Sequence, residues 1–305
     1  MTGLSDFVRD RLHAPVDPLI GAAARVIARR MNGVAVLFYG SVLRTGDIDG
    51  VLDFYVLTGE SAASPGLQRL GSRLLWPDVS YHEVTLGDRV IRAKVATMPL
   101  AIFAQAADGR MLDTTIWARF VQPSALIWSV DTGVADRVAA AVAAAARTAA
   151  RYAAVLGPIH GTTRDYWQAL FRETYQTELR VEKPGREDQI LGFAPDHFDR
   201  LLTLAWEADG LPYHRDGARL VPRVPEAEAR ALVEQWYDRR RAGKPLNAAR
   251  LIKAAFTFEG AARYALWKIQ RHTGIFMPVT PFRERHPILA APGILWRVWL
   301  TTAFR

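Results

Sequence analysis

Residues 34–58 read VAVLFYGSVLRTGDIDGVLDFYVLT, and this stretch decides the fold predicted for the first half of the chain. Its two flanks, Val34–Gly40 and Val51–Leu57, are short runs rich in β-branched and aromatic residues, which are typical of buried strands. A glycine-containing turn joins them. The stretch therefore predicts two neighbouring strands, with Asp53 inside the second one.

The segments on either side extend this mixed pattern. Pro18–Met31 has helical periodicity and ends at an Asn-Gly turn signal. Val79–Thr85 and Arg89–Ala96 predict two more strands, and Pro99–Ala107 predicts a helix. The apolar run Trp117–Trp128 contains a proline, so we expect that it cannot form one uninterrupted central strand.

Helical patterns dominate the second half of the chain. Val138–Leu156 is rich in alanine, the strongest helix former, and Gly157-Pro158 is expected to end it. Three further segments are predicted to be helical: Asp165–Leu179, Pro195–Ala208 and Pro225–Arg241. We therefore predict an α+β fold with a mixed-sheet domain at residues 1–131, a mostly helical domain at 132–260 and C-terminal helices at 261–305.

The densest basic cluster lies at the end of the last predicted helix and comprises Arg239, Arg240, Arg241 and Lys244. Basic side chains complement the dipole at a helix C-terminus, and the nearby Gly243 and Pro245 are expected to stop the helix. We interpret the cluster as a solvated helix end. Binding of an anionic surface or ligand is the alternative, with phospholipid or nucleotide favoured over duplex DNA.

The composition excludes several classes of function. Of the 305 residues, 50% are hydrophobic and 23% are charged, which is the balance of a chain that folds around a core. The absence of cysteine excludes disulfide scaffolds, thiol nucleophiles and cysteine-ligated zinc. The net charge is +8, but no zinc-finger or RNA-recognition pattern is present, so no nucleic-acid partner is expected. With neither an apolar run of about 18 residues nor a secretory signal, we expect a cytoplasmic protein.

The chemistry of the first segment centres on Gly40, Ser41 and Asp53. Nucleotidyltransferase sites have this layout: a strand, a Gly-Ser turn, and a second strand with an acid that points inward. Glycine lets the backbone approach a triphosphate, and the serine hydroxyl and nearby amides can bind its oxygens. A carboxylate on the next strand can hold Mg²⁺, which bridges phosphates during attack on the α-phosphorus. An ordinary β-turn is the alternative, but a lone carboxylate buried in an apolar strand is costly unless it binds something.

Additional metal ligands are less clear from the sequence. Asp47 is better interpreted as a turn residue, whereas Asp49 could be either a turn residue or a metal ligand. His82 and Glu83 occupy opposite faces of a predicted strand and cannot both enter one site without a bulge. We expect this pair on the surface, with Glu83 as a further metal carboxylate as the alternative.

The segment YGSVLRTGDIDGVLDFYVLTGE resembles the Tyr-Gly-Ser…Leu-Asp-Phe segment of the mitochondrial-type phosphatidate cytidylyltransferases, also called CDP-diacylglycerol synthases. Arg89–Thr97 resembles the family strand that carries a basic residue. Ile116–Pro123 resembles a later family segment, with Arg119 and Pro123 matching. Two positions depart from the family pattern: Gln122 stands where the family has lysine, and Ala118 where it has glycine.

This resemblance implies a nucleotidyltransferase-like domain, a winged-helix-like helical domain and a C-terminus that touches a membrane. It also implies CTP and phosphatidate as substrates and Mg²⁺ as cofactor. Gly40 and Ser41 would bind the triphosphate and Asp53 the metal, while Arg92 or Lys94 would contact phosphates. The nucleotide-binding set that we predict is completed by Tyr39, Arg44 and Arg119.

Residues 292–305, PGILWRVWLTTAFR, combine two tryptophans with flanking arginines. This pattern suits an amphipathic helix on an anionic membrane surface, so we expect peripheral attachment to the inner face of a membrane. Docking of the helix on the protein's own core is the alternative.

Two functional hypotheses also stay open: nucleotidyl transfer to a small alcohol, RNA or protein hydroxyl, and a degenerate domain that binds nucleotide or membrane without turnover.

Overall fold

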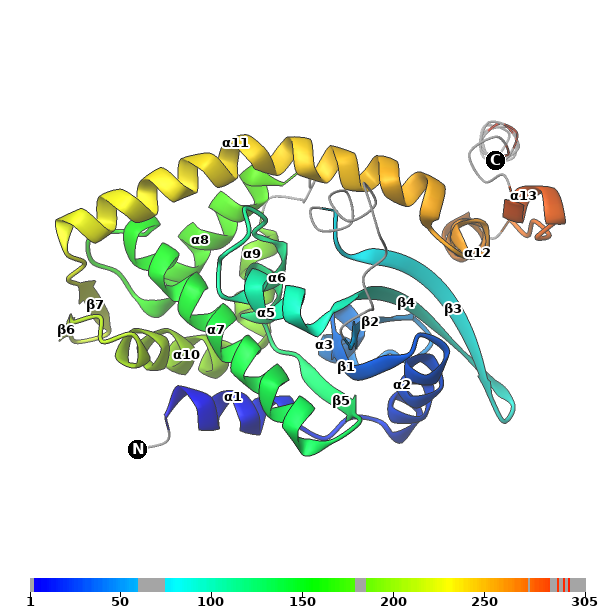
Figure 1. Cartoon of the computed structure of the whole chain (residues 1–305), viewed down its shortest axis with the longest axis horizontal. Coiled ribbons are helices and arrows are strands. Elements are labelled where there is room, and N and C mark those ends of the chain that lie inside the picture. Colours follow the sequence, from blue (N-terminus) through cyan, green and yellow to red (C-terminus); the bar gives the residue numbers. More distant parts are fainter. Residues whose placement is uncertain are drawn as a thin grey trace.

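A five-stranded mixed sheet carries the segment around Asp53 (Figure 1). The computed structural model describes residues 3–59, 75–178, 185–273 and 275–285, together with residues 290, 293 and 296. The sheet has the order β3-β4-β2-β1-β5, in which β2 and β4 are parallel and the other neighbours are antiparallel. Its strands are β1 (Gly33–Tyr39), β2 (Val51–Thr58), β3 (Asp78–Leu86), β4 (Arg89–Pro99) and β5 (Ala125–Ser129). The predicted α+β fold with a mixed sheet is therefore confirmed.

The register of the sheet sets which side chains share a face with Asp53. Asp53 lies opposite Tyr39 of β1 and opposite Lys94 of β4, and Lys94 in turn lies opposite Tyr81 of β3. Directly opposed residues point to the same face of a sheet. These four side chains therefore form one polar row across the sheet.

Two hydrophobic clusters cover the two faces of the sheet. The face opposite Asp53 packs against α2 (Pro18–Arg30), through residues such as Ile27, Phe38 and Phe54. The Asp53 face continues into a larger core with α5 (Leu100–Ala107), α6 (Thr115–Phe120) and α7 (Thr132–Leu156). As predicted, the proline-containing apolar run divides, here into α6 and β5.

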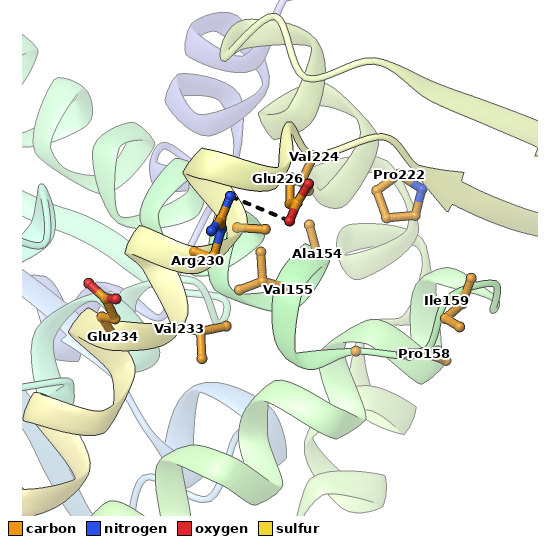
Figure 2. A pocket seen from close by; sticks show the side chains of 12 residues that line it. Ala154, Val155, Pro158, Ile159, Pro222, Val224, Glu226, Arg230, Val233 and Glu234 are labelled. Carbon is orange, nitrogen blue, oxygen red and sulfur yellow. Dashed lines mark ion pairs between the residues drawn. The ribbon is translucent and has the colours of Figure 1, made fainter.

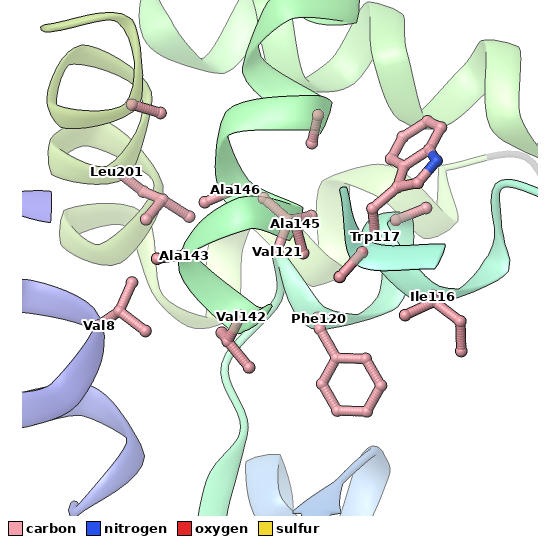
Figure 3. Packing of buried hydrophobic residues seen from close by; sticks show 14 of the residues in the cluster. Val8, Ile116, Trp117, Phe120, Val121, Val142, Ala143, Ala145, Ala146 and Leu201 are labelled. Carbon is pink, nitrogen blue, oxygen red and sulfur yellow. The ribbon is translucent and has the colours of Figure 1, made fainter. Parts of the chain in front are cut away.

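The larger core runs without a break from the sheet into the helical half of the molecule. Small alanine side chains of α7 let the neighbouring elements approach closely. Figure 3 shows them between Val8 of α1 (Leu4–Leu12), Leu201 of α10 (Pro195–Ala208) and Trp117 of α6. Trp117 is stacked on Tyr152 of α7, with ring centroids 5.5 Å apart. Burial of such large aromatic groups supplies much of the stabilisation of a core.

The helical half follows α7 along the chain. Asp131 caps the N-terminus of α7 by accepting a hydrogen bond from the Val134 N–H, and Gly157 ends the helix. The helical half also contains α8 (Thr163–Thr177), α9 (Arg186–Phe193), α10 (Pro195–Ala208), β6 (Tyr213–Asp216) and β7 (Arg219–Pro222). The N-terminal helix α1 (Leu4–Leu12) packs on α7 and α10. The last two strands form a hairpin.

The long helix α11 (Glu226–Thr257) corrects the prediction that the chain would stop being helical at Gly243 and Pro245. At about 48 Å, it runs from the hairpin to the sheet (Figure 1). A Cβ at residue 243 would lie 3.1 Å from the carbonyl carbon of Thr177, so this glycine permits close packing on the end of α8. Two arginines anchor the helix on either side of the proline: Arg239, which is buried, and Arg250, whose side chain is 13% exposed.

Arg239 also corrects the interpretation of the basic cluster as solvated. Its side chain is 4% exposed and donates hydrogen bonds to the Tyr152 hydroxyl and to the carbonyl oxygens of Met111 and Gly109. Arg240 and Arg241 are exposed, as expected. Within the cluster, Arg239 therefore packs inside the protein, whereas Arg240 and Arg241 are solvated.

The chain then continues into α12 (Ala261–Thr273), which packs on β3, and α13 (Pro281–Arg285), which packs on α12. The Tyr81 N–H donates to the Glu259 carbonyl oxygen at 2.8 Å, which fixes the start of α12 on β3. No helix in the described part of the chain is long and apolar enough to cross a membrane. The amphipathic segment predicted at residues 292–305 lies outside the described residues apart from residues 293 and 296.

Candidate functional site

Gly40 and Asp53 form the centre of the site. Gly40 has φ +93°, a conformation that side chains rarely adopt, and it begins the short helix α3 (Ser41–Thr45). A Cβ at residue 40 would lie 3.1 Å from both Cβ and Cγ of Asp53 and closer still to its Oδ2. Only glycine therefore lets the Asp53 carboxylate lie directly against the backbone of the turn.

A cavity of about 170 Å³ opens over this pair. One wall comes from the first half of the chain and the other from α8 and α9. The residues that line it are Tyr39, Gly40, Ser41, Arg44, Asp53, Arg119, Gln122, Pro123, Tyr175, Arg186, Ile190 and Phe193. The structure thus brings together all the predicted nucleotide-binding residues with Asp53.

Three arginines line the cavity beside a single carboxylate. The guanidinium of Arg119 lies over the ring of Tyr39, 5.1 Å from its centroid. Burial lowers the pKa of Arg44, and the nearby charge of Arg186 lowers it further. The cavity therefore has an excess of positive charge, which favours an anionic ligand.

The charge state of Arg119 is fixed by its surroundings. Burial by itself would lower the pKa of Arg119, but the groups around it outweigh that effect, and the pKa lies above the ordinary arginine value. These groups are Tyr39, Tyr55, Glu178 and Asp53. Arg119 is consequently a permanent cation at the cavity wall.

Asp53 is a buried acid in a cationic environment. Burial raises the pKa of the Asp53 carboxyl above its ordinary value, while Lys94, Arg119 and Arg44 act in the opposite direction. Burial is the stronger effect, so the folded state holds the carboxylate at a cost in free energy. A cationic or proton-donating ligand would relieve this cost.

Of the two basic residues proposed on β4, Lys94 lies opposite Asp53 in the sheet and acts on its charge. Arg92 lies two residues away, opposite Glu83, with its Nε 3.8 Å from Glu83 Oε1. The guanidinium of Arg92 also lies over the ring of Trp267 in α12, 5.6 Å from its centroid. The structure therefore places Lys94 with Asp53 and places Arg92 in a contact between β3, β4 and α12.

The alternative metal carboxylates lie away from the cavity. Glu83 accepts a hydrogen bond from the Tyr81 hydroxyl at 3.0 Å, two strands away from β2. Asp49 is 86% exposed and forms an ion pair with Arg89 at 3.2 Å. Asp47 belongs to the same turn and pairs with Arg271 of α12 at 3.3 Å.

The donor set fits one magnesium ion that arrives with a phosphate ligand. Mg²⁺ commonly binds one or two carboxylates, phosphate oxygens and several waters. Asp53 and the Ser41 hydroxyl are oxygen donors that line the same cavity and would hold the ion. No cluster of three or more His, Asp or Glu side chains that could hold a metal occurs among the described residues.

Sequence reasoning missed the wall formed by Tyr175, Arg186, Ile190 and Phe193. These residues lie more than 120 positions after Asp53 in the chain, and packing of α8 and α9 on the first half brings them to the cavity. Arg186 follows Gly185 at the start of α9. A basic residue after a glycine is too common to serve as a signal without the fold.

A larger cavity of about 570 Å³ lies elsewhere, between the end of α7, β7 and the start of α11. Figure 2 shows that mostly apolar side chains line it, with an ion pair between Arg230 and Glu226 at 3.4 Å. None of the residues predicted to carry chemistry reaches this cavity. We therefore assign the candidate site to the smaller, more polar cavity.

No protein-family model matches this chain, and no curated protein matches its sequence.

Proposed function

We propose that this protein is a nucleotidyltransferase that transfers a cytidylyl group from CTP to phosphatidate, giving CDP-diacylglycerol and pyrophosphate. The observation that carries the proposal is the convergence of Gly40, Ser41 and Asp53 with three arginines on one cavity. The winged-helix-like character of the helical half and the nucleotidyltransferase-like fold belong to the same proposal. The order of three helices followed by a hairpin, α8 to β7, is consistent with it.

The triphosphate would lie over the Gly40–Ser41 turn. The positive φ of Gly40 turns the chain beside Asp53 into α3, and the Ser41 hydroxyl can donate to a phosphate oxygen. Arg44 and Arg119 would hold the remaining charge of the phosphates. Asp53 and Ser41 would hold Mg²⁺, which when bound would bridge phosphate oxygens and offset their negative charge.

The reaction needs little acid–base chemistry from the protein. An ionised phosphate oxygen of phosphatidate attacks the α-phosphorus of CTP, the new P–O bond forms, and the bond to the bridging oxygen of the β-phosphate breaks. The electron pair leaves with pyrophosphate. Positioning and electrostatic stabilisation then supply the rate enhancement, which suits a cavity rich in arginine and poor in bases.

The nucleoside would contact the wall formed by α8 and α9. Beside Arg186, this wall presents the aromatic and apolar side chains of Tyr175, Ile190 and Phe193, opposite the polar wall at Ser41. Bases stack favourably on aromatic side chains. The cavity therefore offers separate environments for phosphates and for a nucleoside.

The choice of phosphatidate and of an anionic membrane surface depends on the sequence resemblance. The test is transfer of radiolabel from α-labelled CTP to vesicles of phosphatidate mixed with phosphatidylcholine, with Mg²⁺ present. Label should enter the lipid fraction only when phosphatidate is included. Label transfer to a soluble alcohol, RNA or protein, but not to lipid, would favour another acceptor.

A second candidate function is nucleotide binding without turnover. The observation in its favour is that Asp53 is the single carboxylate among the residues lining the cavity. CTP binding with no pyrophosphate release from any acceptor would support it.

A further inference from the structure

Arg119 lies between the candidate phosphate site and a buried carboxylate on its far side. Glu178, at the C-terminal end of α8, is 6% exposed. Both residues border a small void of about 10 Å³, close to the minimum that one water molecule occupies. The negative charge of Glu178 acts on Arg119 across this space.

The Glu178 carboxylate is itself held in place. Its Oε1 accepts a hydrogen bond from the Thr114 hydroxyl at 2.9 Å and lies 3.4 Å from the Thr115 hydroxyl. Thr115 has one hydroxyl proton and lies nearer to Asp113, at 2.8 Å, so Thr114 is the stronger donor to Glu178. The carboxylate is thus oriented by the residues that begin α6, the helix that carries Arg119.

The same cluster reaches the long helix α11. Asp113 is 6% exposed and pairs with Arg250 at 2.7 Å, and the Arg250 side chain is 13% exposed. A buried charge is stable only when it is paired and hydrogen-bonded. Each acid therefore has a cation beside it, Arg250 for Asp113 and Arg119 for Glu178, and the Thr115 hydroxyl lies between the two acids.

From this arrangement we infer that Glu178 is a positioning residue that fixes the Arg119 guanidinium toward the phosphates of the nucleotide. An arginine side chain has several rotatable bonds, and fixing them in advance lowers the entropy lost on binding. The Tyr39 ring holds one face of the guanidinium, and Glu178 supplies the charge that orients it. The inference rests on the proposed function for the identity of the bound anion.

The test is calorimetric titration of the full chain with sodium tripolyphosphate, a probe that needs no turnover. Glu178→Gln should weaken binding about tenfold, equivalent to about 1.4 kcal/mol. Thr114→Val, which leaves the carboxylate in place without its hydroxyl donor, should weaken binding by a smaller factor. Asp209→Asn is the matched control. Asp209 is also a buried acid paired with arginines, Arg147 and Arg151, but this cluster does not line the cavity, so the variant should bind tripolyphosphate as the wild type does.

A double-mutant cycle separates positioning from a general structural effect. Arg119→Gln should weaken tripolyphosphate binding, and adding Glu178→Gln to it should cause no further loss. Equal losses from Glu178→Gln in both backgrounds, or no loss in either, would overturn the inference. Wild-type protein that binds tripolyphosphate but does not turn over CTP would count against the proposed function alone, whereas no binding at all would count against both.

Discussion

Gly40 and Asp53 fit together so closely that one methyl group at residue 40 would overlap the Asp53 carboxylate. The turn that would receive a triphosphate and the acid that would hold its metal are therefore a single structural unit. The residues between them form α3 and a turn, and the turn is fixed by ion pairs of Asp49 with Arg89 and of Asp47 with Arg271.

Gly40→Ala should destabilise the protein and remove activity together. The positive φ and the overlap with Asp53 should cost about 2–4 kcal/mol in the free energy of unfolding. Gly46→Ala is the matched control, because Gly46 also has a positive φ, of +71°, but has open space where a Cβ would lie. It should cost about 1 kcal/mol by urea unfolding. Similar losses for the two variants would contradict the close fit.

Asp53→Asn should abolish transfer and yet stabilise the fold. Burial raises the pKa of Asp53, so the folded state binds this proton more tightly than the unfolded chain does. Stability from this group is present below the ordinary pKa of 3.8 and is lost as the pH rises through the folded pKa. At pH 7 the variant should be more stable by about 1 kcal/mol, with the difference vanishing near pH 3. A variant less stable than the wild type at pH 7 would refute this account of Asp53.

Glu83→Gln and Asp49→Asn should keep turnover within about threefold of the wild type. Both carboxylates pair with arginines outside the cavity, so neither can hold a metal there without moving. Steady-state pyrophosphate release measures this directly. Loss of turnover in either variant, with the fold intact by circular dichroism, would restore that residue as a metal ligand.

His197 should make the fold sensitive to acid. Burial lowers the pKa of His197 to about 4, although a hydrogen bond to the Val121 carbonyl oxygen acts the other way, and Arg11 adds to the lowering. The unfolded chain therefore takes up the proton first, and stability that is complete above pH 6.5 is lost as the pH falls toward 4. The loss should reach roughly 3 kcal/mol. His197→Gln should flatten this part of the stability profile in urea titrations; an unchanged slope would exclude His197 as its source.

Arg239→Ala should destabilise the fold by about 3 kcal/mol, since it removes a buried cation bonded to Tyr152 and to two backbone carbonyls. Arg240→Ala, its exposed neighbour, should change stability by less than about 0.5 kcal/mol. Thermal unfolding of the two variants compares them directly. A small effect at both positions would return the cluster to the solvated helix end that the sequence favours.

The sequence predicted the elements whose signal is local. The strand around Asp53 and the alanine-rich helix α7 follow from composition and period, and a buried acid in an apolar strand indicates a site. Pro245 was expected to end a helix because local propensity disfavours proline, but the arginine anchors on both sides, Arg239 and Arg250, override it.

The other half of the cavity could not be predicted in this way. Tyr175 and Arg186 reach it only through packing of α8 and α9 on the first half of the chain. Composition and periodicity do not distinguish Arg119, which lines the cavity, from arginines that form surface ion pairs; the resemblance of Ile116–Pro123 to a family segment singled it out. The sequence likewise did not show that Asp49 pairs with an arginine and does not line the cavity, because its partner Arg89 lies 40 positions away.

The most direct test of the central claim is pyrophosphate release from CTP in the presence of Mg²⁺ and phosphatidate vesicles, compared between wild type and Asp53→Asn. We predict release that depends on phosphatidate in the wild type and a loss of at least about a thousandfold in the variant, whose fold is retained. Equal release by the two proteins, or none from the wild type with CTP, would contradict the assignment of this cavity as a cytidylyl-transfer site.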